Sequence, residues 1–269
     1  MDLTPFRIEP GRAVDLGSVP TDATYGFDGG KAAGRARTAE LVDRLAELQR
    51  RLFAGATERL LVVLQAPDAA GKDGTIGSVF TGVNPHGVRV VSFKKPNDDE
   101  LAHDYLWRVH RHVPARGEIA VFNRSHYEDV LVVRVHGLVP EQTWQRRYDH
   151  INAFERMLAD EGTTIVKVFL HLSRDEQAVR FQERIDDPTK HWKFRLGDLD
   201  ERARWDDYRR AFEAMLERTS TPWAPWFVVP ADRTWFRNLV AAEIVVDALE
   251  RLGLRYPDPE PGLDGLKVT

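Results

Sequence analysis

Five short apolar runs, separated by longer segments with helical spacing, constrain the fold of this chain more than any other feature. The apolar runs are residues 60–64, 88–93, 119–122, 165–170 and 226–229. Several are apolar without alternation, as strands buried on both faces must be. The segments with helical spacing are residues 71–83, 98–113, 141–158, 173–185 and 234–252. Strands that alternate with helices predict right-handed βαβ units, hence an α/β fold of three layers with a five-stranded parallel sheet and helices on both faces.

The two ends of the chain differ from its middle. Residues 1–32 are punctuated by Pro and Gly and predict an extended N-terminal arm, and residues 256–269 predict a similar C-terminal tail. Leucines recur at helical spacing before the first apolar run and predict an amphipathic helix that ends near Gly55. We therefore expect one domain over residues 33–255, with a mobile lid at about residues 180–215.

Composition excludes several classes of protein. The chain has no Cys, which excludes disulfides, thiolate zinc sites and a Cys nucleophile. It contains no apolar run of membrane-spanning length, and its first residues lack the pattern of a secretion signal. Its net charge is −4, so the surface as a whole has no attraction for polyanions. These features predict no membrane or nucleic-acid partner and a cytoplasmic location.

A candidate phosphate-binding loop, QAPDAAGKDGT over residues 65–75, follows the first apolar run. It resembles GxxxxGK[S/T], in which backbone N–H groups and a Lys hold phosphate at a helix N-terminus. Ala66 replaces the first Gly, and Asp73 replaces the hydroxyl that normally contacts Mg²⁺. Asp68 is the nearest substitute ligand, since carboxylates suit Mg²⁺. The alternative is an ordinary strand-to-helix turn, but the flanking strand and helix favour phosphate binding. The phosphate-binding residues are then Ala69, Ala70, Gly71, Lys72, Asp73, Gly74 and Thr75.

A second polar segment, NRSHYED over residues 123–129, follows the third apolar run. Phosphoryl transfer with Mg²⁺ needs a metal-holding acid at a neighbouring strand end and a cation that offsets developing charge. Asp129 and Arg124 can supply these groups. In the alternative reading, Glu128 caps a helix and Arg124 forms a structural ion pair. His126 has no metal-ligand partner at suitable spacing and is interpreted as a packing or hydrogen-bonding residue.

Two basic clusters lie near the expected ligand edge of the sheet. Lys94 and Lys95 follow the second run, where ligands of parallel sheets bind. A basic segment broken by Pro188 has the composition of a closing lid whose cations reach bound phosphate. Solvated charged faces, or a plain helical hairpin, are the alternatives. The candidate lid cations are Arg180, Arg184, Lys190 and Lys193.

With these residues in view, the chain resembles the polyphosphate kinase 2 family over residues 60–252. The blocks that carry the resemblance are PDAAGKDGT (67–75), SFKKP (92–96), ELAHDYLWR (100–108), FNRSHYEDVLVVRV (122–135), DDPTKHWKF (186–194), RARWDDY (202–208) and STPWAPWFVVPADRTWFRN (220–238). The resemblance implies a P-loop kinase-like fold similar to that of thymidylate kinase, with inorganic polyphosphate as donor. The segment SHYEDVLV resembles the subgroup that phosphorylates both AMP and ADP. We also expect a homo-oligomer.

By the same resemblance, Lys72 and the loop amides grip phosphate, while Asp68 and Asp129 organise Mg²⁺ or Mn²⁺. Asn123, Arg124 and Glu128 would contact an adenine or other purine nucleotide. Lys94 and Lys95 would begin the polyphosphate channel, which the lid cations complete. The expected reaction is direct in-line transfer, reversible and without a covalent nucleophile. An ATP-dependent nucleoside monophosphate kinase and a non-catalytic nucleotide-binding module remain the alternatives.

Overall fold

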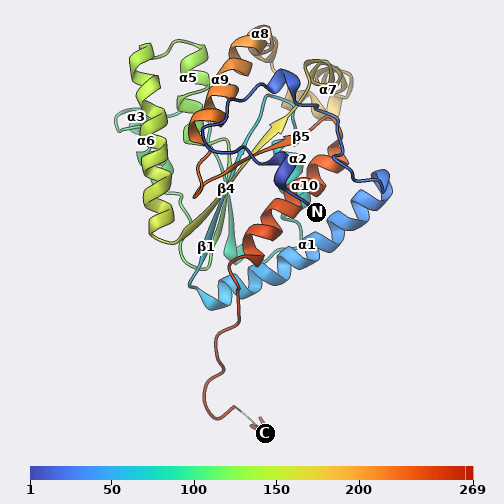
Figure 1. Cartoon of the computed structure of the whole chain (residues 1–269), viewed down its shortest axis with the longest axis vertical. Coiled ribbons are helices and arrows are strands. Elements are labelled where there is room, and N and C mark those ends of the chain that lie inside the picture. The colour runs from blue at the N-terminus through green and yellow to red at the C-terminus, as the bar shows by residue number, and fades with distance from the viewer. Residues whose placement is uncertain (264, 269) are drawn as a thin grey trace.

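The computed structural model, which describes residues 1–263 and 265–268, confirms the predicted α/β class (Figure 1). All five predicted strands are present and parallel, in the order β2-β3-β1-β4-β5. The strands are β1 (Arg59–Gln65), β2 (Val88–Ser92), β3 (Ile119–Asn123), β4 (Thr163–His171) and β5 (Trp226–Pro230). The order reverses at the central strand β1, so the loop after β1 lies where ligands of such sheets bind.

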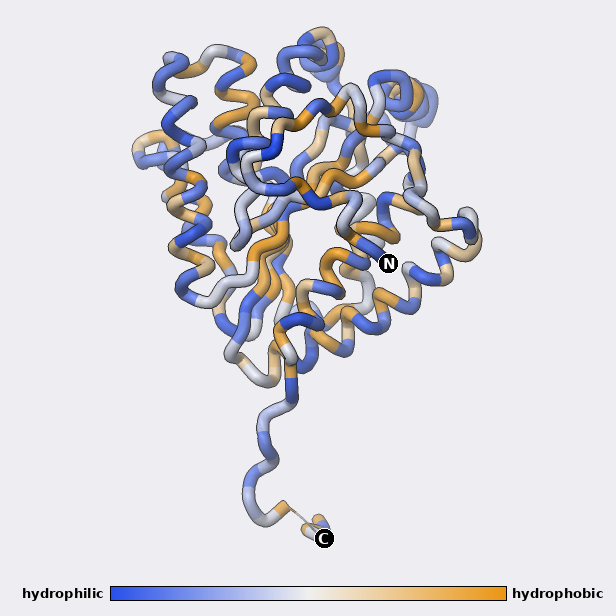
Figure 2. The backbone as a smooth tube through the Cα atoms, in the orientation of Figure 1, coloured by the Kyte–Doolittle hydropathy of each residue, from blue (hydrophilic) through white to orange (hydrophobic). Residues whose placement is uncertain are grey.

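The sheet is apolar because helices cover both of its faces. Residues 60–65 of β1 are all buried, and Figure 2 shows hydrophobic segments in the central strands. One face packs against α1 (Gly30–Gly55), α2 (Lys72–Val79) and α10 (Thr234–Glu250). The other face packs against α6 (Glu141–Asp160) and α9 (Trp205–Thr219), next to the short helix α5 (Val132–Val135). This is the three-layer arrangement that the alternating pattern predicts.

The remaining elements are short and lie mostly around the carboxyl edge of the sheet. They are the helices α3 (Asp98–Leu101), α4 (Trp107–His110), α7 (Arg174–Asp186) and α8 (Gly197–Ala203), and the 3-10 turns η1 (Thr4–Phe6), η2 (Leu16–Ser18), η3 (Pro85–Gly87), η4 (His126–Asp129) and η5 (Pro188–Lys193).

Two helix predictions need correction. The single helix predicted over residues 98–113 is two short helices, α3 and α4, with an irregular stretch between them. The Asp104 side chain accepts hydrogen bonds from the N–H groups of Leu106 (3.0 Å) and Trp107 (3.1 Å), and it therefore starts a new turn. The helix predicted over residues 71–83 ends at Val79, shortly before Gly82 with φ of 74°.

The N-terminal arm is docked on the domain. Phe6 is buried in the core, Arg7 forms an antiparallel bridge with Phe227 of β5, and the N–H of Ile8 donates to the carbonyl of Trp226 (2.9 Å). Figure 1 shows the arm, in dark blue, crossing the front of the molecule before α1 begins. The arm thus packs against the domain beside β5.

The region predicted as a lid is uneven in burial. None of residues 187–204, which cover η5 and α8, is buried, and Trp192 is 77% exposed. The C-terminal half of α9 instead inserts Phe212, Met215 and Leu216 into the core. The segment free of core contacts is therefore shorter than residues 180–215. Across the described residues, no helix has the length and apolarity needed to span a membrane.

Candidate active site at the carboxyl edge of the sheet

The loop between β1 and α2 adopts a conformation that only certain residues accept easily. Ala69 and Gly71 both have positive φ, 62° and 96°. A Cβ at Gly71 would lie 2.0 Å from Nη1 of Arg237, so a larger residue would displace this guanidinium, and the positive φ itself favours Gly. A left-handed non-glycine residue such as Ala69 is strained, and such strain concentrates at ligand sites.

Arg180 donates hydrogen bonds to the backbone of this loop. Its Nη1 donates to the carbonyls of Ala69 (3.1 Å) and Ala70 (3.3 Å), and its Nη2 donates to the carbonyls of Ala231 (2.7 Å) and Asp232 (3.0 Å). The side chain is only 12% exposed. Arg180, expected among the lid and channel cations, thus ties the loop after β1 to the loop after β5.

Two further side chains hold loop carbonyls, and neither was among the predicted site residues. Nη1 of Arg237 in α10 donates to the carbonyl of Ala70 (2.7 Å), and Nε2 of Gln177 in α7 donates to the carbonyl of Asp68 (2.9 Å). Burial, reinforced by nearby Arg180, lowers the pKa of Arg237 to about 10. The N–H of Ala70 donates within the loop to the carbonyl of Pro67 (3.3 Å), and the N-terminus of α2, which follows the loop, is the kind of helix end at which anions bind.

Lys72, the first residue of α2, lies against the loop. Its Nζ donates to the carbonyl of Ala66 (3.1 Å). Burial, followed by the positive charge of Arg124, lowers the pKa of Lys72 to about 8. A bound phosphate would offset both effects, since an anion favours the charged ammonium form.

Arg124 connects the loop to the segment after β3. Its φ is 62°, and its guanidinium forms ion pairs with Asp68 (2.7 Å) and Glu128 (3.4 Å). Glu128 is the main cause of a raised Arg124 pKa, so the guanidinium stays charged. Nearby, Nδ2 of Asn123 donates to Asp73 (2.5 Å). The structure thus brings together Asp68, Arg124 and Glu128, three of the predicted site residues.

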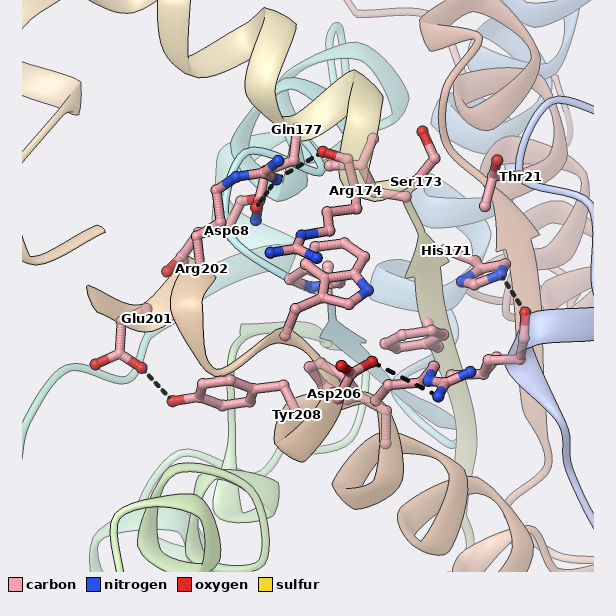
Figure 3. A pocket seen from close by; sticks show the side chains of 18 of the residues that line it. Thr21, Asp68, His171, Ser173, Arg174, Gln177, Glu201, Arg202, Asp206 and Tyr208 are labelled. Atoms are coloured by element: carbon pink, nitrogen blue, oxygen red, sulfur yellow. Dashed lines mark hydrogen bonds and ion pairs between the residues drawn. The ribbon is translucent and has the colours of Figure 1, made fainter. Parts of the chain in front are cut away.

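These three side chains line a cavity of about 610 Å³ (Figure 3). Its other walls come from the arm, from α7 and from the α8–α9 region, and they include residues that sequence reasoning missed: Arg174, Gln177, Glu201, Arg202 and Tyr208. Arg202 donates to the carbonyl of Arg174 (2.6 Å), and the Tyr208 hydroxyl donates to Glu201 (2.6 Å). Arg202 and Tyr208 belong to the RARWDDY block, and this block was the sequence feature that could have marked them as site residues. The cavity has the size typical of a small-molecule site.

Asp129, predicted to hold a metal together with Asp68, lines a different cavity from Asp68 in this structure. Its carboxylate pairs with Arg147 of α6 (2.8 Å) and faces a second cavity of about 470 Å³, also lined by Arg108 and Tyr105. Burial raises the pKa of Asp129 to about 6, although Arg147 opposes the shift. The two aspartates therefore do not share a cavity. Among the described residues, no group of three or more His, Cys, Asp or Glu side chains is arranged to hold a metal by itself.

The other predicted cations lie outside the 610 Å³ cavity. Lys94 and Lys95 are exposed, and Arg108 donates to the Lys94 carbonyl (2.9 Å). Arg184 donates to the Lys193 carbonyl (3.1 Å), and Lys190 pairs with Asp187 (3.0 Å). These five residues are Lys94, Lys95, Arg184, Lys190 and Lys193, and none of them lines the cavity.

Comparisons with known proteins show which family the chain resembles. A family model described as polyphosphate kinase 2 matches residues 29–255. The AMP/ADP-polyphosphate phosphotransferase of Meiothermus ruber is 57% identical over 263 residues, which cover 98% of each chain. The ADP-polyphosphate phosphotransferase of Rhodopseudomonas palustris is 44% identical over 95% of this chain and 92% of its own. The crystal structure of polyphosphate kinase 2 from Arthrobacter aurescens has a TM-score of 0.93 at 46% identity, covering 97% of this chain and 93% of that one.

A family match over most of the chain, relatives of similar length and a superposable structure lead to one conclusion: the chain belongs to the polyphosphate kinase 2 family.

Proposed function

We propose that this protein is a phosphotransferase that moves the terminal phosphoryl group of inorganic polyphosphate to AMP and to ADP, reversibly. The observation that carries the proposal is the ion-paired set Asp68, Arg124 and Glu128, which faces a nucleotide-sized cavity beside the Lys72 loop. The names of the relatives from Meiothermus ruber and Rhodopseudomonas palustris support the choice of donor and acceptors.

In the proposed reaction, an oxygen of the acceptor's terminal phosphate attacks the terminal phosphorus of polyphosphate. The bond from that phosphorus to the bridging oxygen breaks, and the donor leaves shortened by one phosphate. Lys72 and the loop N–H groups would hold the donor end, while Arg124 would offset charge on the transferred group. Glu128, beside Arg124, would help to set the length of the acceptor. No covalent nucleophile is required, because such transfers depend on alignment and charge stabilisation.

We further propose Mg²⁺ as the cofactor, with Mn²⁺ as a substitute. Asp68 fits this role, since its carboxylate faces the cavity and is 32% exposed. Mg²⁺ in phosphoryl-transfer sites is held by one or two carboxylates together with substrate phosphates, and a complete protein cage is not needed. The metal would neutralise phosphate charge. Asp73, which accepts a hydrogen bond from Asn123, is a second carboxylate nearby, in the first turn of α2.

Lys94, Lys95, Arg184, Lys190 and Lys193 are proposed to form the polyphosphate channel and lid when residues 187–204 close. The double substitution Lys94→Ala and Lys95→Ala should raise the KM for polyphosphate and leave the KM for AMP unchanged. Self-association stays a prediction, which light scattering of the purified protein would test.

A two-donor assay tests the proposal most directly. Purified protein is given AMP with polyphosphate and, separately, AMP with ATP, and the nucleotide products are resolved by chromatography. We expect ADP and ATP from polyphosphate. Turnover with ATP alone would identify a nucleoside monophosphate kinase, and binding without turnover would identify a regulatory module.

The Lys72→Ala variant links turnover to the loop. We expect its rate to fall by about 10²-fold or more, because a charge stabiliser is removed. Lys31→Ala, an exposed Lys at the start of α1, is the matched control and should keep the full rate. Near-normal turnover by a folded Lys72→Ala protein would remove the proposed site.

A further inference from the structure

The N-terminal arm builds one wall of the 610 Å³ cavity. Its segment 16–22 contributes Leu16, Gly17, Val19, Pro20, Thr21 and Asp22 to the lining. The segment crosses the carboxyl end of β4, where Figure 3 shows Thr21 beside His171. No sequence signal placed the arm near the site, because its partners lie far away along the chain.

The wall is fixed to the domain by side chains that reach it from the sheet edge. Nε2 of His171 lies 3.0 Å from the carbonyl of Leu16 and 3.1 Å from that of Val19. Burial lowers the pKa of His171, so the imidazole is neutral and shares one Nε2 proton between the two carbonyls. Thr21 donates its hydroxyl to Asp232 (2.7 Å) and accepts the Asp232 N–H at its carbonyl (3.1 Å).

The cavity is polarised along its length. Figure 3 shows Asp68 and Glu201 on one side and Thr21 and His171 on the other. The first side holds the charged set around Arg124. The side near the arm carries apolar surface from Leu16, Val19, Pro20, Phe169 and Phe212, together with polar groups of Thr21, His171 and Arg209. A nucleotide has the same polarity, with charged phosphates at one end and a flat, weakly polar base at the other.

From this match we infer that arm residues 16–22 bind the nucleoside moiety of the acceptor and set which bases are accepted. The inference rests on the proposed function for the identity of the acceptor. With the acceptor phosphate at Arg124, the base extends toward Val19 and Pro20 and is covered on the opposite side by the aromatic residues of α9. The arm is then a specificity element, and the phosphate loop has no part in choosing the base.

Binding of AMP without any donor tests the inference by titration calorimetry. Val19→Ala removes two carbons from the wall, and we expect the Kd for AMP to rise about 4- to 15-fold. Val19→Phe should weaken AMP binding by occupying the base site. Pro20→Ala, at an exposed position of the same wall, repeats the test where folding is not at risk. Arg12→Ala, in the exposed arm but outside the cavity, is the matched control and should bind AMP normally.

Two kinetic readouts separate this role from general damage to the site. The KM for polyphosphate should stay within about two-fold in the Val19 variants, since donor binding does not use the wall. The preference for AMP over CMP should change, because the wall contacts the base. Unchanged AMP affinity in all three wall variants, or an equal rise of both KM values, would overturn the inference. If the wild-type protein binds AMP but does not use polyphosphate, the proposed function fails and the binding experiment still decides the role of the arm.

Discussion

Arg180→Met should destabilise the folded protein, because this guanidinium donates hydrogen bonds to four backbone carbonyls, and the Ala70 carbonyl alone among these four also accepts from Arg237 (2.7 Å). The carbonyls belong to Ala69, Ala70, Ala231 and Asp232. They come from the loops after β1 and β5, so a single side chain joins two strand ends. Met has a similar length and keeps the apolar contacts of the stem, so the substitution mainly removes donors and charge.

The size of the effect follows from burial. Arg180 is 12% exposed, so water cannot readily replace the lost donors. Each charged hydrogen bond contributes about 1.5–3 kcal/mol, but bonds from one group are not additive. A buried acceptor left without its donor costs about 1–3 kcal/mol, so we expect a total of about 3–5 kcal/mol for the carbonyls of Ala69, Ala231 and Asp232. For a chain of this size, each kcal/mol lowers Tm by about 2–4 °C, so a fall of about 6–20 °C is expected.

The assay is thermal and urea unfolding, both monitored by circular dichroism, together with phosphoryl transfer measured on the same samples. Arg184→Met is the matched control for stability, since Arg184 lies one turn further along α7 and donates to the exposed Lys193 carbonyl (3.1 Å). We expect the control to change the free energy of unfolding by less than about 0.5 kcal/mol. Turnover by Arg180→Met should fall as well, because the loop loses its brace.

The opposite pattern would refute this reasoning. If Arg180→Met unfolds at the wild-type urea concentration yet loses turnover, then Arg180 acts on bound phosphate as a lid cation. The four hydrogen bonds would in that case contribute nothing measurable to the fold.

Three further predictions concern the phosphate site. The pKa of Lys72, at about 8, lies below that of an ordinary Lys, so the free enzyme loses this charge as pH rises. The kcat/KM for polyphosphate should therefore decline above about pH 8, and a profile flat to pH 10 would contradict the assignment. Glu128→Ala should change the ratio of AMP to ADP turnover, measured with each acceptor at saturation, whereas an unchanged ratio would discard its role in acceptor length. Asp68→Asn should reduce the rate by about 10²-fold and raise the Mg²⁺ requirement, while Asp129→Asn, paired to Arg147 in the other cavity, should affect stability more than the Mg²⁺ requirement. Equal Mg²⁺ dependence in both variants would restore Asp129 as a metal ligand.

Periodicity predicted the sheet well because burial on both faces is a property of each strand alone. Residues 60–65 of β1 are buried, and a buried strand needs apolar residues whichever strands lie beside it. A local apolar run is therefore sufficient to predict such a strand. The prediction of one helix over residues 98–113 was wrong, and the reason is again local. Asp104 competes for the N–H groups of the following residues, and a single capping side chain does not disturb the apolar spacing.

The phosphate loop was readable for the same reason as the strands. Its residues lie within one short segment, and Lys72 contacts Ala66 only six positions away. The hydrogen bonds from Arg180 and Arg237 to the loop could not be predicted, because these residues lie 110 and 167 positions further along the chain. Spacing within a segment carries no information about such partners. Arg180 was consequently assigned by its basic neighbourhood, and Arg237 was not assigned at all.

The different placement of Glu128 and Asp129 shows where strand-end reasoning stops. Both residues follow β3, but they lie in the 3-10 turn η4, in which successive side chains point about 120° apart. Glu128 therefore faces Arg124 and the first cavity, and Asp129 faces Arg147 and the second. Position after a strand predicts the edge of the sheet at which a residue lies, but not the direction of its side chain.

The direction of that turn is fixed from inside the core by charges that no local pattern reveals. Nζ of Lys167, fully buried in β4, donates to Glu155 (2.6 Å), to the Tyr127 hydroxyl (2.8 Å) and to the Thr219 carbonyl (2.6 Å). Glu155 also accepts the Tyr127 hydroxyl (2.8 Å) and lies 3.2 Å from Nε2 of His126. A buried Lys is tolerated only when all of its donors are paired, so these bonds hold His126 and Tyr127, the first two residues of η4, in one orientation. Glu128 and Asp129, which follow in η4, are thereby directed to different cavities. The arrangement of the candidate site therefore depends on Lys167, a cation in the middle of β4.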